Sequence, residues 1–135
     1  MCIRDRSNTL HTDFRLLVYP HKHTCEAGYA DLQRGAERRM AHAFSILDNE
    51  AQEWSGPLGA PTIIDYYVVT MMRWCALYPR KDQTWFNIVS YPTLNALAKS
   101  IETRPAVRAA IQAEGLNETP FSLPEYSNPP EGTAI

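Results

Sequence analysis

The sequence lacks several features that would mark whole classes of protein. No apolar run is long enough to cross a membrane, because Asp65 and Arg73 interrupt the most hydrophobic stretch. The net charge of −2 lacks the basic footprint typical of nucleic-acid-binding proteins. The three cysteines have no paired spacing, which argues against a disulfide scaffold and favours a reducing, cytoplasmic location. We therefore expect neither a membrane nor a nucleic acid as partner.

The first seven residues, MCIRDRS, have no apolar segment of the kind found in a signal peptide. They look like a translated sequencing adapter joined to a truncated reading frame. We expect residues 1–7 to be non-native, so that the genuine sequence begins near Asn8. The alternative is a short disordered N-terminus.

What is present is a pattern of helices with no convincing strand and no internal repeat. The 135 residues, 44% of them hydrophobic, fit one domain with a modest core. Apolar periodicity predicts helices over 8–19, 29–54, 62–78 and from 92 onward, and a further helix from Pro105 to Gly115. Segment 84–90 is compatible with a helix or a strand, and its neighbours favour a helix. Residues 117–135 hold four prolines, which predicts an irregular tail. The expected fold is an all-α bundle of five to six helices with this Pro-rich tail.

The stretch GAPTIIDYYVVTMMRW predicts the central helix of that bundle. Thr62 is suited to the N-cap, and Asp65 can reach back to the Thr62 N–H, a capping box with Asp in place of Glu or Gln. Asp65 also places negative charge at the positive end of the helix dipole. Beyond it, the helix is apolar almost all round, which is typical of a helix surrounded by others. We expect Thr62 and Asp65 to be structural.

Three segments together resemble one protein family. They are LHTDF, PTIIDYYVVTMMRW and YPTLNALAKSIETRPAVRAAIQAEGL. Residues 8–116 are similar to the C-terminal helical domain of soluble glutathione transferases, and most similar to the bacterial, beta-class-like members. The Thr-x-x-Asp box that opens the core helix is the family's folding motif.

The resemblance implies a two-domain enzyme of which this chain holds the second half. The missing first domain would be thioredoxin-like, bind glutathione and carry the Tyr, Ser or Cys that handles its sulfur. The helical domain would supply most of the pocket for a small hydrophobic electrophile and part of a homodimer interface. Glutathione would be a co-substrate, no cofactor would be tightly bound, and this chain alone would be inactive.

The resemblance also implies roles for four residues. His11 matches a histidine near the glutathione sulfur, where an auxiliary role is expected. Phe14 matches an aromatic wall of the electrophile pocket, and Tyr67 and Trp74 match pocket residues on the core helix. Tyr67 and Trp74 are seven residues apart and therefore project from one face. The alternatives are a partly buried, hydrogen-bonded His11 and two ordinary core aromatics.

Other features favour simpler interpretations. His21, His23 and Cys25 form an H-x-H-x-C pattern, but no fourth ligand has suitable spacing, so no metal site is predicted. Cys75 is predicted to be a small core residue.

Two alternatives to the transferase interpretation remain. The main one is a non-catalytic, glutathione-transferase-like interaction module, and the other is an unrelated bundle that shares the capping box.

Overall fold

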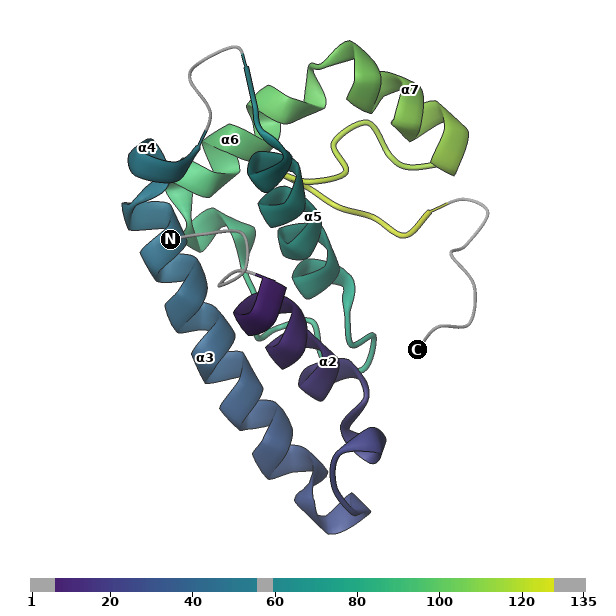
Figure 1. The fold of residues 1–135 in the computed structure, drawn as a ribbon. Coiled ribbons are helices and arrows are strands. Elements are labelled where there is room, and N and C mark those ends of the chain that lie inside the picture. The colour runs from purple at the N-terminus through teal and green to yellow at the C-terminus, as the bar shows by residue number, and fades with distance from the viewer. Residues whose placement is uncertain (1–6, 56–59, 128–135) are drawn as a thin grey trace.

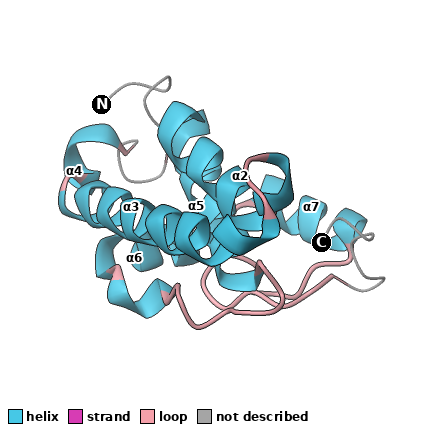
Figure 2. Ribbon diagram, turned by 90° about the horizontal axis from the view of Figure 1, so that it is seen from below, coloured by secondary structure: helices cyan, strands magenta, loops and turns pink. Residues whose placement is uncertain are grey.

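The computed structural model describes residues 7–55 and 60–127, and within these ranges it contains helices and loops but no strand (Figure 2). The predicted all-α bundle is confirmed. Its α-helices are α2 (Thr12–Val18), α3 (Tyr29–Asn49), α4 (Ala51–Trp54), α5 (Ile63–Leu77), α6 (Pro92–Glu102) and α7 (Pro105–Glu114). A π-helical turn, η1 (Ser7–His11), leads into α2, and three short 3-10 turns are η2 (Pro20–Lys22), η3 (Glu26–Gly28) and η4 (Ile88–Ser90). None of the described helices is long and apolar enough to span a membrane.

Helix α5 lies at the centre of the bundle. Helices α2 and α3 run alongside each other on one side of it, and α6 packs against both α3 and α5 (Figure 1). Five α5 side chains are fully shielded from solvent: Val68, Val69, Met71, Met72 and Cys75. They pack with fully buried side chains from the other helices, including Leu10, Met40, Phe44 and Leu94. This burial explains why the α5 sequence is apolar around most of its circumference.

The predicted capping box is present at the start of α5. Thr62 is extended, with φ −90° and ψ 171°, and the Asp65 carboxylate accepts from its backbone N–H at 2.5 Å. The same Oδ2 atom accepts from the Thr62 hydroxyl at 2.7 Å. Asp65 has no exposed surface, whereas Thr62 is exposed. A buried carboxylate therefore stands at the positive end of the helix dipole and satisfies one of its otherwise unpaired N–H groups.

The prediction of a helix over 84–90 is wrong except for the short turn η4 at its end. The reason is local competition from side chains. The Asp82 carboxylate accepts from the Thr84 backbone N–H at 2.9 Å and from its hydroxyl at 2.7 Å. The Asn87 side chain then accepts from the Val89 N–H at 3.0 Å. These bonds hold the segment in turns and leave Phe86 to stack on Tyr91 with a centroid distance of 5.4 Å.

The predicted helix over 29–54 is interrupted once. Helix α3 ends at Asn49, and Glu50 separates it from the single turn of α4. The predicted start of one helix at Pro92 and of another at Pro105 is confirmed, as is the stop at Gly115. Gly115 has φ 62°, in the left-handed region that favours glycine at a helix C-cap.

The tail from Leu116 to Ser127 is irregular, as predicted, and is bonded to the bundle. The buried Glu102 carboxylate accepts from the Phe121 and Ser122 N–H groups at 2.8 and 2.7 Å and from the Ser122 hydroxyl at 2.9 Å. The Tyr126 hydroxyl donates to the Leu77 carbonyl at 2.7 Å. These bonds fix the tail beside α5 and α6. Residues 1–6 of the expected adapter and residues 128–135 of the tail lie outside the described residues.

Candidate functional site

The fold brings three of the four predicted pocket residues together. The Phe14 and Trp74 rings are stacked, with centroids 5.8 Å apart and planes 25° apart. The His11 ring meets Trp74 edge to face at 6.3 Å and 86°. Both geometries lie in the favourable range for aromatic pairs. We refer to His11, Phe14 and Trp74 as the aromatic cluster.

The local structure of two helices explains the aromatic cluster. His11 ends η1 and Phe14 lies three residues later on α2, so both face the same side. Trp74 lies in the last turn of α5, which is the side that α2 approaches (Figure 1). Phe14 is buried, Trp74 is half-buried and His11 is exposed. The cluster therefore runs from the core to the surface and presents an imidazole to solvent.

Tyr67 is placed differently from the other predicted pocket residues. It lies two turns before Trp74 on α5, packs against the core and takes part in none of the cluster's ring contacts. Its hydroxyl oxygen is shielded from solvent and has no hydrogen-bond partner within 7–55 and 60–127. Burial raises the pKa of this phenol, and the nearby Cys75 adds to the increase. Tyr67 therefore stays neutral at physiological pH.

The residues on either side of Trp74 face inward. The Arg73 guanidinium is buried and donates to the Pro120 carbonyl at 3.3 Å, which ties it to the tail. Cys75 has no exposed surface, as expected of a core residue, and burial raises the pKa of its thiol. A buried neutral thiol is a poor nucleophile because the thiolate is the reactive form.

An ion pair beside the aromatic cluster was not predicted from the sequence. Asp13, between His11 and Phe14, is buried and accepts from Arg39 Nε at 2.9 Å and Nη2 at 2.6 Å. The hydrogen bond that Arg39 donates to Asp13 is the main cause of the raised Arg39 pKa. The available signal was an acidic residue beside the apolar stripe of the first helix, with an arginine on the helix that packs against it.

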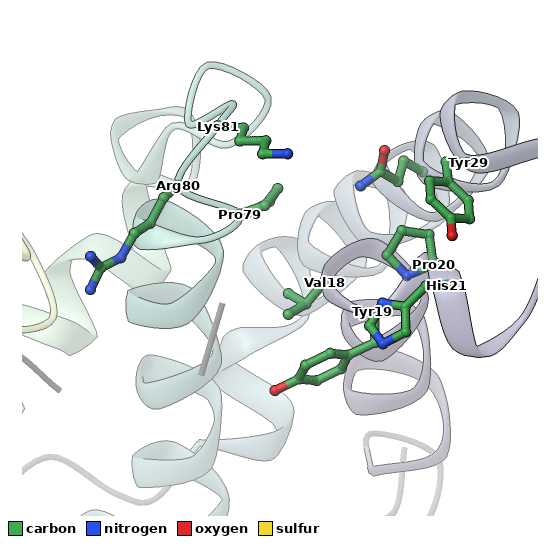
Figure 3. A pocket seen from close by; sticks show the side chains of 9 residues that line it. Val18, Tyr19, Pro20, His21, Tyr29, Pro79, Arg80 and Lys81 are labelled. Atoms are coloured by element: carbon green, nitrogen blue, oxygen red, sulfur yellow. The ribbon is translucent and has the colours of Figure 1, made fainter. Parts of the chain in front are cut away.

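Among the pockets of the described residues are two whose lining includes neither the aromatic cluster nor Tyr67. One, of about 420 Å³, lies where α2 and α5 end (Figure 3). The other, of about 280 Å³, lies between α7 and the tail and includes Tyr66.

His21, His23 and Cys25 are exposed on the connector before α3. Within 7–55 and 60–127, no three His, Cys, Asp or Glu side chains lie close enough together to bind a metal ion.

Comparison of the chain with protein-family models, with curated proteins and with solved structures gives no match. The resemblance to glutathione transferases accordingly rests on the sequence motifs, and the function that follows from it is a proposal.

Proposed function

We propose that residues 8–116 are the helical, co-substrate-binding domain of a glutathione transferase. The complete enzyme would join the glutathione thiolate to a small hydrophobic electrophile. The observation that carries this proposal is the contact of His11 and Phe14 on the first helix with Trp74 on the core helix. These are positions that the sequence resemblance assigns to the electrophile pocket.

The aromatic cluster has the chemistry that such a pocket needs. Stacked Phe14 and Trp74 rings offer a flat apolar surface, and the half-buried indole keeps part of that surface accessible. An apolar electrophile would gain binding energy by covering it. The exposed His11 imidazole, edge-on to Trp74, supplies a polar group at the rim of the same surface. There it can donate a hydrogen bond to a polar substituent or to the sulfur.

The reaction divides between two domains in this proposal. A residue of the thioredoxin-like domain stabilises the glutathione thiolate. The thiolate then attacks an electrophilic carbon, so that a carbon–sulfur bond forms and the leaving group departs with its electron pair. The helical domain contributes proximity by holding the electrophile near the sulfur. The chain itself offers no activated thiol at Cys75, because that thiol is buried and its pKa is raised. Residues 7–55 and 60–127 alone are expected to give no turnover.

The test is to recover the upstream coding sequence, express it joined to this chain, and assay conjugation of glutathione to 1-chloro-2,4-dinitrobenzene. We expect a thioredoxin-like domain upstream, glutathione-dependent chloride release by the two-domain protein, and none by the 135-residue chain. Unrelated upstream sequence would refute the proposal. A thioredoxin-like domain without glutathione affinity or turnover would instead favour the non-catalytic interaction module.

A further inference from the structure

Two members of the aromatic cluster are held by a very short helix. Helix α2 has seven residues and carries Phe14, and His11 stands at its N-cap without making a side-chain capping bond. Isolated helices shorter than about 12–15 residues are marginal in water, so α2 depends on its neighbours for its position. Whatever fixes the rotation of α2 about its axis also fixes where the two rings lie relative to Trp74.

Helix α3 holds α2 near both of its ends. The two helices lie alongside each other, and outside its own flanking turns α2 packs chiefly against α3 (Figure 1). Near the start of α2, the Asp13 carboxylate accepts from Arg39 Nε at 2.9 and 3.1 Å and from Nη2 at 2.6 Å. Near its end, the Leu17 carbonyl accepts from Gln33 Nε2 at 2.8 Å. Attachment at two points fixes both the rotation and the slide of α2 along α3.

The pair of Asp13 with Arg39 is the stronger of these attachments. Two nitrogens of one guanidinium bond to one carboxylate, a geometry that fixes direction as well as distance. The Asp13 side chain is only 10% exposed, so water is a poor substitute for Arg39. A Cβ atom at Gly35, one turn earlier on α3, would lie 3.3 Å from Arg39 Nη1. Glycine is unfavourable inside a helix, and here its missing side chain leaves room for the guanidinium.

The position of Asp13 between His11 and Phe14 links this ion pair to the aromatic cluster. Successive side chains of a helix point about 100° apart, so Asp13 meets α3 while Phe14 meets Trp74. Rotation of α2 would turn the Phe14 ring away from the indole. The stacked arrangement, with ring centroids 5.8 Å and planes 25° apart, therefore depends on where Asp13 is held.

We propose that Asp13 and Arg39 are positioning residues of the electrophile surface. Their ion pair sets the rotation of α2, and with it the flat surface of Phe14 and Trp74 and the place of His11 at its rim. The effect on catalysis rests on the proposed function, whereas the effect on ring geometry does not. Arg39 acts through Asp13, and Asp13 acts through the helix that carries Phe14. A misplaced surface holds the electrophile poorly relative to the sulfur, which lowers the rate of conjugation.

The first experiment uses the full chain and near-UV circular dichroism, in which Trp74→Leu identifies the contribution of Trp74. Arg39→Lys keeps the positive charge but loses the two-nitrogen fork, and Arg39→Met loses both. We expect Arg39→Lys to lose part of the Trp74 signal and Arg39→Met to lose most of it, with unchanged far-UV spectra. The matched controls Arg38→Lys and Arg38→Met, at the exposed neighbouring position on α3, should retain the whole signal. A Trp74 signal as large in both Arg39 variants as in the controls would overturn the proposal.

The second experiment uses the two-domain enzyme and separates positioning from stability. Arg39→Met leaves the buried Asp13 carboxylate without its cation, so it should lower the urea midpoint as well as kcat/KM for 1-chloro-2,4-dinitrobenzene. Adding Asp13→Leu removes that buried charge and should bring the urea midpoint back toward wild type. We expect kcat/KM of the double variant to stay about five- to tenfold low, with KM for glutathione within about twofold of wild type.

Recovery of kcat/KM together with the urea midpoint would show a merely structural pair and overturn the proposal. Arg39→Lys gives the same decision without a buried unpaired charge: kcat/KM should fall about threefold, whereas kcat/KM equal to that of Arg38→Lys contradicts positioning. If the wild-type two-domain protein shows no conjugation, the proposed function fails by itself. The near-UV comparison of Arg39→Met with Arg38→Met then still decides whether the ion pair positions the aromatic cluster.

Discussion

Replacement of Asp65 by alanine should destabilise the bundle more than loss of an ordinary surface carboxylate. Asp65 is fully buried, and one of its oxygens accepts both the Thr62 N–H at 2.5 Å and the Thr62 hydroxyl at 2.7 Å. A hydrogen bond to a charged group contributes about 1.5–3 kcal/mol. The negative charge of Asp65 at the helix N-terminus adds about 0.3–1 kcal/mol. The Thr62 hydroxyl belongs to an exposed residue and can bond to water in the variant. Its lost bond to Asp65 therefore adds nothing to the expected change in unfolding free energy. The expected loss of unfolding free energy is about 2–4 kcal/mol, or about 10 °C in melting temperature.

The assay is urea unfolding followed by circular dichroism at 222 nm, with two comparisons. Asp65→Asn keeps an acceptor of the same size but removes the charge, and should cost about 1–2 kcal/mol. Asp31→Ala is the matched control, because Asp31 is also in the first turn of a helix but is exposed. It should cost less than about 0.5 kcal/mol. If Asp65→Ala costs no more than Asp31→Ala, the carboxylate does not hold the start of α5 and the reasoning fails.

Three further predictions follow from other buried groups. Glu102→Ala removes the acceptor of three hydrogen bonds from the tail and should cost about 2–3 kcal/mol, since the released N–H groups can reach water. Limited proteolysis should then cut within 116–127 before the helices, and equal cleavage of wild type would contradict this. Burial raises the pKa of Cys75 and of two tyrosines, Tyr67 and Tyr91, so the unfolded chain loses these protons first. Stability should therefore fall as pH rises above about 9, as urea midpoints would show. Native Cys75 should also resist iodoacetamide while exposed Cys25 reacts; equal labelling would contradict its burial.

Much of the fold was predictable because the determining signals are local. The N-cap pair Thr62 and Asp65, the prolines that begin α6 and α7, and Gly115 each act through bonds within a few residues. Apolar periodicity is also a local pattern, and it predicted α2, α3 and α5. The segment around Trp85 and Phe86 was mispredicted because two side-chain-to-backbone caps outweighed its hydrophobic pattern.

The candidate site was predictable only in part. Spacing places Tyr67 and Trp74 on one face of α5, but it does not decide which ring packs against the next helix. In the structure Trp74 meets Phe14 and His11, whereas the Tyr67 hydroxyl is buried without a partner among the described residues. The Asp13–Arg39 pair and the cavity at the end of α2 depend on contacts between distant segments, which periodicity does not encode.

The most direct test of the proposed function is to vary the aromatic cluster in the two-domain enzyme. Trp74→Leu should lower kcat/KM for 1-chloro-2,4-dinitrobenzene about tenfold, through loss of the flat surface that Trp74 forms with Phe14, while KM for glutathione stays unchanged. The matched control Trp85→Leu removes a half-buried tryptophan that packs on Phe86 and should leave kcat/KM within about twofold. Equal effects of the two substitutions, or a Trp74→Leu enzyme with wild-type kcat/KM, would contradict the placement of the electrophile on this surface.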